Sequence, residues 1–130
     1  MEGKKMRKAI ILSGPIASGK TTIAFGIKDF YELGEWIYTN NHRKAIYYQD
    51  LTTFKLVILD ECIGLPEIES FEPLREKYPH CNFIFCTQSD IKKVDNDKYN
   101  LIGCRPLYKH LVIPDYEHTP PPPPSPVNDL

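Results

Sequence analysis

The residues from Ser13 to Thr21 contain the pattern G-x-x-x-x-G-K-[ST], which is typical of a loop that holds phosphate groups. Glycine allows the backbone to pass close to the phosphates with its N–H groups turned inward. The lysine supplies a point charge for the β- and γ-phosphates, and the threonine hydroxyl is placed to bind Mg²⁺. The spacing therefore predicts a nucleotide-binding loop. The residues expected to bind the nucleotide are Gly14, Pro15, Ala17, Ser18, Gly19, Lys20, Thr21 and Thr22.

The sequence on either side of this loop supports that interpretation. The run from Ala9 to Leu12 is short and entirely apolar, which is typical of a strand buried on both faces. After the loop, Ile23, Ile27 and Phe30 recur at helical spacing. The loop is therefore expected to connect a buried strand to the first turn of a helix, where backbone N–H groups favour anions.

A second apolar run, from Leu56 to Leu59, ends in the two carboxylates Asp60 and Glu61. An acid at the carboxyl end of a neighbouring parallel strand faces the loop and holds Mg²⁺, usually through water, so Thr21 and Asp60 are the predicted metal residues. Glu61 is then suited to act as the general base, or to orient water, for attack on the γ-phosphate. The competing interpretation is that both carboxylates simply end a core strand in solvent.

A third apolar run, from Cys81 to Cys86, ends in Thr87 and Gln88. The amide of Gln88 offers a donor and an acceptor, which suit a hydrogen bond to the γ-phosphate or to the attacking water. A polar exit from a strand explains the same residues equally well. Cys81 and Cys86 flank a run expected to be buried, where cysteine behaves as a small hydrophobe.

Length, charge and cysteine spacing limit the remaining classes of protein. A chain of 130 residues with a net charge of −1 can bury one core, and this charge gives no support to a nucleic-acid partner. The four cysteines lack the paired spacing of a zinc site, and no apolar stretch is long enough for a membrane span or a signal peptide. These features favour a reduced cytoplasmic protein without structural metal, which binds a nucleotide and no membrane.

Strand and helix patterns alternate along the chain, which predicts an α/β fold with three layers, namely about five mainly parallel strands flanked by helices. The strands are expected at residues 8–13, 36–40, 55–60, 82–87 and 108–113. Helices are expected after the phosphate loop as far as Gly34, over residues 41–50 with Asn40 or Asn41 as cap, and from Pro66 onward. Pro73 predicts either two short helical turns or a restart there, and residues 91–100 are expected to form an exposed loop or helix.

The carboxyl-terminal residues differ from the rest in composition. Six of the seven residues from Pro120 to Pro126 are proline, a run that favours polyproline II and joins neither a sheet nor a helix. The predicted division is a P-loop ATPase domain over residues 1–116 and a proline-rich tail over residues 117–130. The tail suits a protein partner with an aromatic groove, and it equally suits a structureless end.

The order of the three motifs resembles the additional-strand, catalytic-glutamate division of P-loop ATPases, which includes AAA+ proteins and superfamily 3 viral replication helicases. The likeness covers residues 8–114 and lies in Gly14-Pro15, in the apolar strand with two acids, and in a late arginine. The chain departs from that family at Gln88, where an asparagine is usual, and in a stretch after Glu61 that is too short for a DNA-contacting hairpin. The resemblance implies catalytic roles for Lys20, Glu61, Gln88 and Arg105, with the arginine acting across a subunit boundary.

The sequence therefore predicts a small Mg²⁺-dependent protein that binds and hydrolyses ATP, and that forms a homo-oligomer if Arg105 acts in trans. A link to nucleic-acid replication or remodelling is implied by the resemblance alone. Two alternatives stay open, namely a nucleoside or nucleotide kinase and a nucleotide-gated interaction module without significant turnover. Arg105 also fits an ordinary surface arginine.

Overall fold

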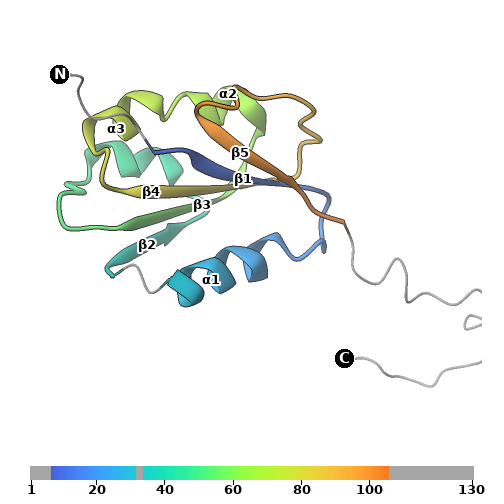
Figure 1. The fold of residues 1–130 in the computed structure, drawn as a ribbon, viewed down its shortest axis with the longest axis horizontal. Helices are drawn as coiled ribbons and strands as arrows, with labels where there is room; N and C mark the ends of the chain where they lie inside the picture. The colour runs from blue at the N-terminus through green and yellow to red at the C-terminus, as the bar shows by residue number, and fades with distance from the viewer. Residues whose placement is uncertain (1–6, 32–33, 106–130) are drawn as a thin grey trace, which may run out of the picture.

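The computed structural model describes residues 7–31 and 34–105, which contain one five-stranded parallel sheet (Figure 1). Its strands are β1 (Ala9–Ser13), β2 (Trp36–Thr39), β3 (Leu56–Cys62), β4 (Asn82–Thr87) and β5 (Tyr99–Gly103). Every pairing between neighbours is parallel, and the strand order is β2-β3-β4-β1-β5. The carboxyl ends of β1, β3 and β4 therefore meet at one edge of the sheet, which is where the three sequence motifs end.

Helices cover both faces of this sheet, so the predicted three-layer α/β fold is confirmed (Figure 1). On one face lies α1 (Lys20–Tyr31), and the described residues resume at Gly34, the predicted limit of this helix. On the other face lie α2 (Gly64–Glu69) and α3 (Glu72–Lys77). The 3₁₀ helix η1 (Arg43–Tyr48) follows β2 and contributes Ile46 to the core on the side of α2 and α3. No helix in the described ranges is long and apolar enough to cross a membrane.

The strand β3 forms the centre of the core because both of its faces are covered. Leu56, Val57, Ile58 and Leu59 are at most 1% exposed. Successive side chains of a strand point to opposite faces. Val57 and Leu59 accordingly join the cluster under α2 and α3, whereas Leu56 and Ile58 join the cluster under α1. An unbroken apolar run is typical of a strand that is buried in this way.

The helix predicted after the phosphate loop is confirmed as α1. Of the apolar residues that marked it, Ile23 and Phe30 are 39% and 78% exposed. Ala24 is buried instead, and Ile27 packs against the same cluster. The phosphate loop sets the rotation of the helix, because Lys20 turns inward at its first residue and Ala24 lies one turn later on that side.

The strand β5 (Tyr99–Gly103) was not predicted from the sequence. The range Tyr99–Gly103 forms β5, so only residues 91–98 of the predicted loop or helix are outside regular structure. An edge strand that contains Asn100 and ends in a glycine has a weak strand pattern, and its place is set by pairing with β1. The predicted strand at 108–113, the boundary at residue 116 and the proline-rich tail lie outside the described residues.

Two further helix predictions are decided by the structure. Residues 41–50 contain only the 3₁₀ helix η1, a common form for a short connector. Its cap is His42 without a side-chain hydrogen bond, so the predicted cap at Asn40 or Asn41 is wrong. The two short helices α2 and α3 confirm the prediction of two helical segments around Pro73.

Candidate functional site

The phosphate loop runs from the end of β1 to the first turn of α1 and borders a cavity of about 220 Å³. Its backbone turns sharply, since Ala17 and Gly19 both have positive φ, at 66° and 82°. Glycine adopts this region freely, whereas alanine is strained there, and strain of this kind is retained at functional loops. Gly14 and Pro15 lie outside the cavity wall. The other predicted binding residues line it, namely Ala17, Ser18, Gly19, Lys20, Thr21 and Thr22.

Gly14 makes a close backbone approach at the start of the loop. Its N–H donates to the carbonyl oxygen of Thr87 at 3.1 Å, which ties the loop to the end of β4. A Cβ atom on Gly14 would lie 2.4 Å from the carbonyl oxygen of Cys104, so a larger residue fits only if the backbone moves. Gly14 therefore allows the loop to pack closely against the backbone at Thr87 and at Cys104.

Gly14→Ala is expected to lower the free energy of unfolding by about 1–3 kcal/mol, since overpacking costs energies of that order. Gly26→Ala on α1 is the matched control. Nothing lies within 4 Å of the Cβ that it adds, and alanine is the better helix former by ~1 kcal/mol. Chemical denaturation of both variants gives the comparison, and equal stability of the two would contradict the close approach at Gly14.

The side chain of Lys20 is buried, and its ammonium lies inside the loop. Nζ donates to the carbonyl oxygens of Gly14 and Pro15, both at 2.7 Å, and to Oγ of Ser18 at 3.3 Å. These bonds use all three donors of the ammonium, which keeps a buried charge satisfied. The positive charge is thus held at the cavity wall, as binding to the β- and γ-phosphates requires.

The carboxylate of Asp60 connects the phosphate loop to β2 and β3. Oδ2 accepts hydrogen bonds from the hydroxyls of Thr21 at 2.8 Å and Tyr38 at 2.6 Å, and Oδ1 accepts from the N–H of Glu61 at 2.8 Å. The residue is 5% exposed, so these donors take the place of water. Although β4 separates β3 from β1, the structure brings the predicted metal residues Thr21 and Asp60 into contact.

Tyr38 is a residue of this site that the sequence motifs did not reveal. Burial and the hydrogen bond to Asp60 raise the pKa of its phenol, so Tyr38 remains a donor at neutral pH. Its ring packs on Phe25 of α1, with the ring centroids 5.2 Å apart. In the sequence, Tyr38 is one aromatic residue of a short strand, and nothing in that pattern separates it from a packing residue.

Glu61 follows Asp60 in a left-handed backbone conformation, with φ of 59°. The pairing of β3 with β4 shifts register between Leu59 and Cys62, as at a β-bulge. At this irregularity Asp60 is buried and Glu61 is exposed, while both line the cavity. The hydroxyl of Thr87 donates to the carbonyl oxygen of Cys62 at 2.7 Å and holds the strand beyond the bulge. Such strain persists where the surroundings enforce it, and it is concentrated at functional sites.

An ion pair between η1 and α2 supports the bulge. Arg43 binds Glu67 through Nε to Oε2 at 2.6 Å and Nη2 to Oε1 at 3.1 Å, and its Nη1 donates to the carbonyl oxygen of Asp60 at 3.3 Å. Glu67 also accepts from the N–H of Ile63 at 2.6 Å. Burial acts to raise the pKa of Glu67, but the bonds from Arg43 and Ile63 hold it below its ordinary value. The pair therefore fixes the backbone on both sides of Glu61. Its members are 24 positions apart, and no sequence signal links them.

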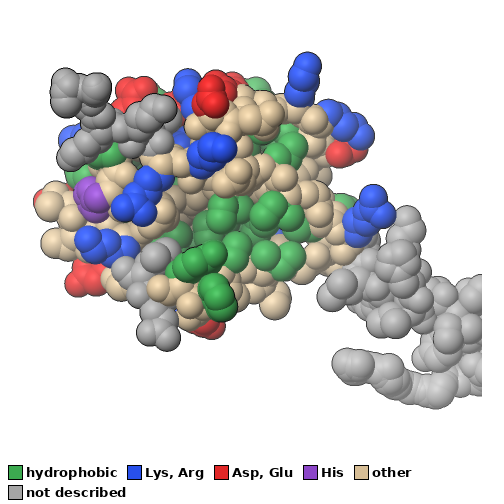
Figure 2. All heavy atoms as spheres, in the orientation of Figure 1, with side chains coloured by type: hydrophobic (Ala, Val, Ile, Leu, Met, Phe, Trp, Pro, Cys, Tyr) green, Lys and Arg blue, Asp and Glu red, His purple; other side chains and the backbone are tan. Residues whose placement is uncertain are grey.

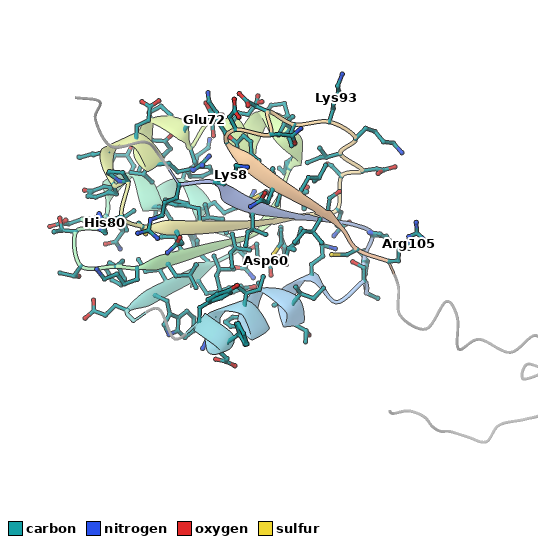
Figure 3. All side chains as sticks on the ribbon, viewed as in Figure 1. Lys8, Asp60, Glu72, His80, Lys93 and Arg105 are labelled. Atoms are coloured by element: carbon teal, nitrogen blue, oxygen red, sulfur yellow. The ribbon has the colours of Figure 1, made fainter. Side chains whose placement is uncertain are left out.

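The remaining predicted catalytic residues occupy different places. Gln88 follows β4 and lines the cavity together with Glu61. Arg105 is exposed and does not line the cavity, and Figure 3 shows it well apart from Asp60. The structure thus brings Lys20, Glu61 and Gln88 to one cavity and leaves Arg105 outside it.

The four cysteines are buried and form no disulfide. Burial raises the pKa of the Cys62 thiol to about 12 and that of the Cys81 thiol to about 11. Both thiols are therefore protonated at neutral pH. The predicted burial of Cys81 and Cys86 is confirmed.

No protein-family model matches the chain. The chain is similar to a tRNA dimethylallyltransferase of Phytoplasma australiense, with 32% identity over 118 residues. The alignment covers 90% of this chain and 39% of the relative, so the chain spans about two fifths of that protein's length. The parallel sheet, the loop geometry and this relative together fit a P-loop nucleotide-binding protein.

Proposed function

We propose that this protein binds Mg·ATP and hydrolyses it. The observation that carries the proposal is a single cavity of about 220 Å³ whose wall combines the phosphate loop with Asp60, Glu61 and Gln88. A loop that only binds phosphate needs no acid beside it. Attack of water on the γ-phosphate needs a group that orients the water and accepts its proton. Glu61 is exposed and lines this cavity, so it is the group we assign to that step.

The oxygen groups beside the loop suit Mg²⁺. The Thr21 hydroxyl and the Asp60 carboxylate lie 2.8 Å apart, and Mg²⁺ takes hard oxygen ligands of this kind. When bound, the ion neutralises charge on the β- and γ-phosphates. Thr21, whose hydroxyl donates to Asp60, would keep a lone pair for the ion, and Asp60 would hold the ion through water. Lys20 exchanges its bonds to the loop carbonyls for bonds to phosphate oxygens.

The strand order supports the additional-strand, catalytic-glutamate division. β4 stands between β1, which leads into the phosphate loop, and β3, which carries Asp60 and Glu61. An extra strand between the two motif strands is what the name of that division describes. We further propose a homo-oligomer in which Arg105 reaches the phosphate site of a neighbouring copy. Arg105 is exposed and outside the cavity wall of its own chain, as a group used in trans has to be.

A transferase is the second candidate, and the relative favours it. That protein's name describes transfer of a dimethylallyl group to tRNA, and its similarity extends over 90% of this chain. A loop that cradles phosphates can hold them on several kinds of donor. The same cavity therefore suits phosphoryl transfer by a nucleoside or nucleotide kinase, or transfer of a group that leaves from a diphosphate. The identity of the acceptor separates these reactions from hydrolysis.

Phosphate release from ATP in the absence of any acceptor tests the proposal. We expect release that depends on Mg²⁺ and is unchanged by added nucleosides. Product formation that requires a nucleoside would instead favour a kinase, and a requirement for tRNA and a dimethylallyl donor would favour the transferase. Tight ATP binding without release would indicate a nucleotide-gated interaction module.

Tyr38→Phe is expected to raise the Mg²⁺ concentration for half-maximal ATP turnover about tenfold, because a hydrogen bond to a charged group is worth ~1.5 kcal/mol or more. The variant keeps the ring on Phe25 but removes the hydrogen bond to Oδ2 of Asp60. Tyr47→Phe is the matched control, since Tyr47 stacks on Phe71 and does not line the cavity. Titration with Mg²⁺ at saturating ATP gives the two midpoints, and equal midpoints would contradict the role of Tyr38.

A further inference from the structure

A groove of about 610 Å³ follows β5, the strand at one end of the sheet order. We call it the β5 groove, and the lining residues that matter here are Lys8, Lys92, Lys93, Asn96, Asn100 and Ile102. Figure 3 shows Lys8 beside β1 and β5, and Lys93 on the loop that leads into β5. Figure 2 shows this face of the molecule, where lysine and arginine side chains lie around an exposed hydrophobic area together with several carboxylates. The groove thus combines positive charge with apolar surface at the edge of the sheet.

The β5 groove is more basic than the chain as a whole. Three lysines and no carboxylate stand among its lining residues, whereas the chain has a net charge of −1. Lys92 pairs with Asp90 at 3.0 Å, but these side chains are 81% and 80% exposed, so the pair contributes little and opens readily. Lys8 and Lys93 form no ion pair with another described residue. Among the described residues, no buried partner holds any of these three ammonium groups.

The remaining side chains suit the sugars and bases of a polynucleotide. Asn96 and Asn100 are exposed, and an amide both donates and accepts hydrogen bonds, as a ribose 2′-hydroxyl does. Ile102 is 41% exposed and offers an apolar surface to an unstacked base.

We propose that the β5 groove binds single-stranded RNA. The lysines hold the phosphates and the two asparagines hold ribose hydroxyls and base edges, so each kind of side chain in the groove has a partner. An acidic peptide matches the groove less well, because its carboxylates engage the lysines alone. The site lies outside the phosphate cavity, and it shares no lining residue with that cavity.

The loop that supplies Lys92 begins at the phosphate cavity, which Gln88 lines. Between these two residues, the carbonyl oxygen of Ser89 accepts a bond from the hydroxyl of Ser13 at 2.6 Å, and the N–H of Ile91 donates to that same hydroxyl at 3.2 Å. The loop is thus tied to the residue that precedes the phosphate loop. RNA in the groove is therefore expected to change ATP turnover. This effect on ATP turnover rests on the proposed function, whereas the binding of RNA to the groove does not.

Fluorescence anisotropy with a labelled oligouridylate of about ten nucleotides, in the absence of ATP, tests the binding. Three phosphate contacts on a single strand predict a slope of log K against log salt of about −2, which is a loss of roughly 20-fold between 50 and 200 mM salt. The triple variant Lys8→Ala, Lys92→Ala, Lys93→Ala is expected to lose this salt-dependent affinity. The control triple variant removes the same charge from exposed lysines outside the groove, at Lys44, Lys55 and Lys77. The control is expected to bind like the unmodified protein.

Equal losses in the two triple variants would show that binding follows net charge, and they would overturn the assignment to the groove. Equal affinity for the matching oligodeoxythymidylate would overturn the choice of RNA, and displacement of RNA by an equal charge of polyglutamate would assign the groove to an acidic partner. RNA binding without any ATP turnover would support the groove and refute the proposed function. RNA binding that leaves ATP turnover unchanged would overturn the coupling alone.

Discussion

Glu61→Gln is expected to lower ATP turnover by about 100-fold or more and to leave the affinity for Mg·ATP nearly unchanged. Glutamine keeps the shape of the side chain, so the bulge with its φ of 59° is preserved. The neutral amide cannot accept a proton from the attacking water, and general-base catalysis contributes roughly 100- to 10,000-fold. Binding is retained because Lys20 and the loop N–H groups hold the phosphates, and Glu61 makes no hydrogen bond to either of them.

Phosphate release and nucleotide affinity are measured on the same preparation of this variant. Glu69→Gln is the matched control, because Glu69 is an exposed carboxylate of α2 that does not line the cavity. The control is expected to retain full turnover. Unchanged turnover in Glu61→Gln would refute the assignment of the base. A loss of binding together with turnover would show that Glu61 shapes the site instead of acting on water.

The core of the site could be predicted because a short, continuous sequence pattern marks each of its elements. A strand that is buried on both faces has no polar side, so the run from Leu56 to Leu59 is recognisable without knowledge of its neighbours. Parallel strands place their carboxyl ends at one edge, which allowed Thr21 and Asp60 to be paired although they are 39 positions apart. The structure adds that β4 separates the two strands concerned.

The residues that steady the bulge could not be predicted because their contacts are tertiary. Tyr38, Arg43 and Glu67 reach Asp60 or its neighbours from three different elements, and none of them has a spacing that marks a function. Their side chains occur equally often in ordinary packing and on ordinary surfaces. The need for such support becomes visible in the structure, where Glu61 has a strained, positive φ that its surroundings must hold in place.

Two features of the fold lay beyond the sequence patterns for a related reason. Helical spacing in α1 leaves open which apolar face is buried, and the inward turn of Lys20 selects the face of Ala24 over that of Phe30. The edge strand β5 carries Asn100, and only its pairing with β1 turns it into a strand. The buried face of α1 and the strand conformation of β5 are both set by neighbouring elements, which a local sequence pattern does not contain.

Lys20→Ala is expected to weaken Mg·ATP binding by roughly 100-fold, or ~2.7 kcal/mol, and to reduce turnover at least as much. The ammonium is buried at the cavity wall, so its attraction to the phosphates is screened less than that of a surface lysine. In the free protein, its loss removes only the bonds to the carbonyl oxygens of Gly14 and Pro15 and to Oγ of Ser18. The stability of the free protein is therefore expected to change little.

Thermal denaturation with and without Mg·ATP distinguishes a loss of nucleotide binding from a loss of stability in the free protein. A ligand that binds only the folded state stabilises it by ~2.7 kcal/mol at 100 times its Kd. The unmodified protein and the Lys77→Ala control, whose lysine is exposed on α3 outside the cavity, are expected to gain stability from Mg·ATP. Lys20→Ala is expected to gain almost none while melting normally alone. An undiminished gain in Lys20→Ala would mean that the nucleotide binds elsewhere, and it would refute the phosphate loop as the site on which the proposed function depends.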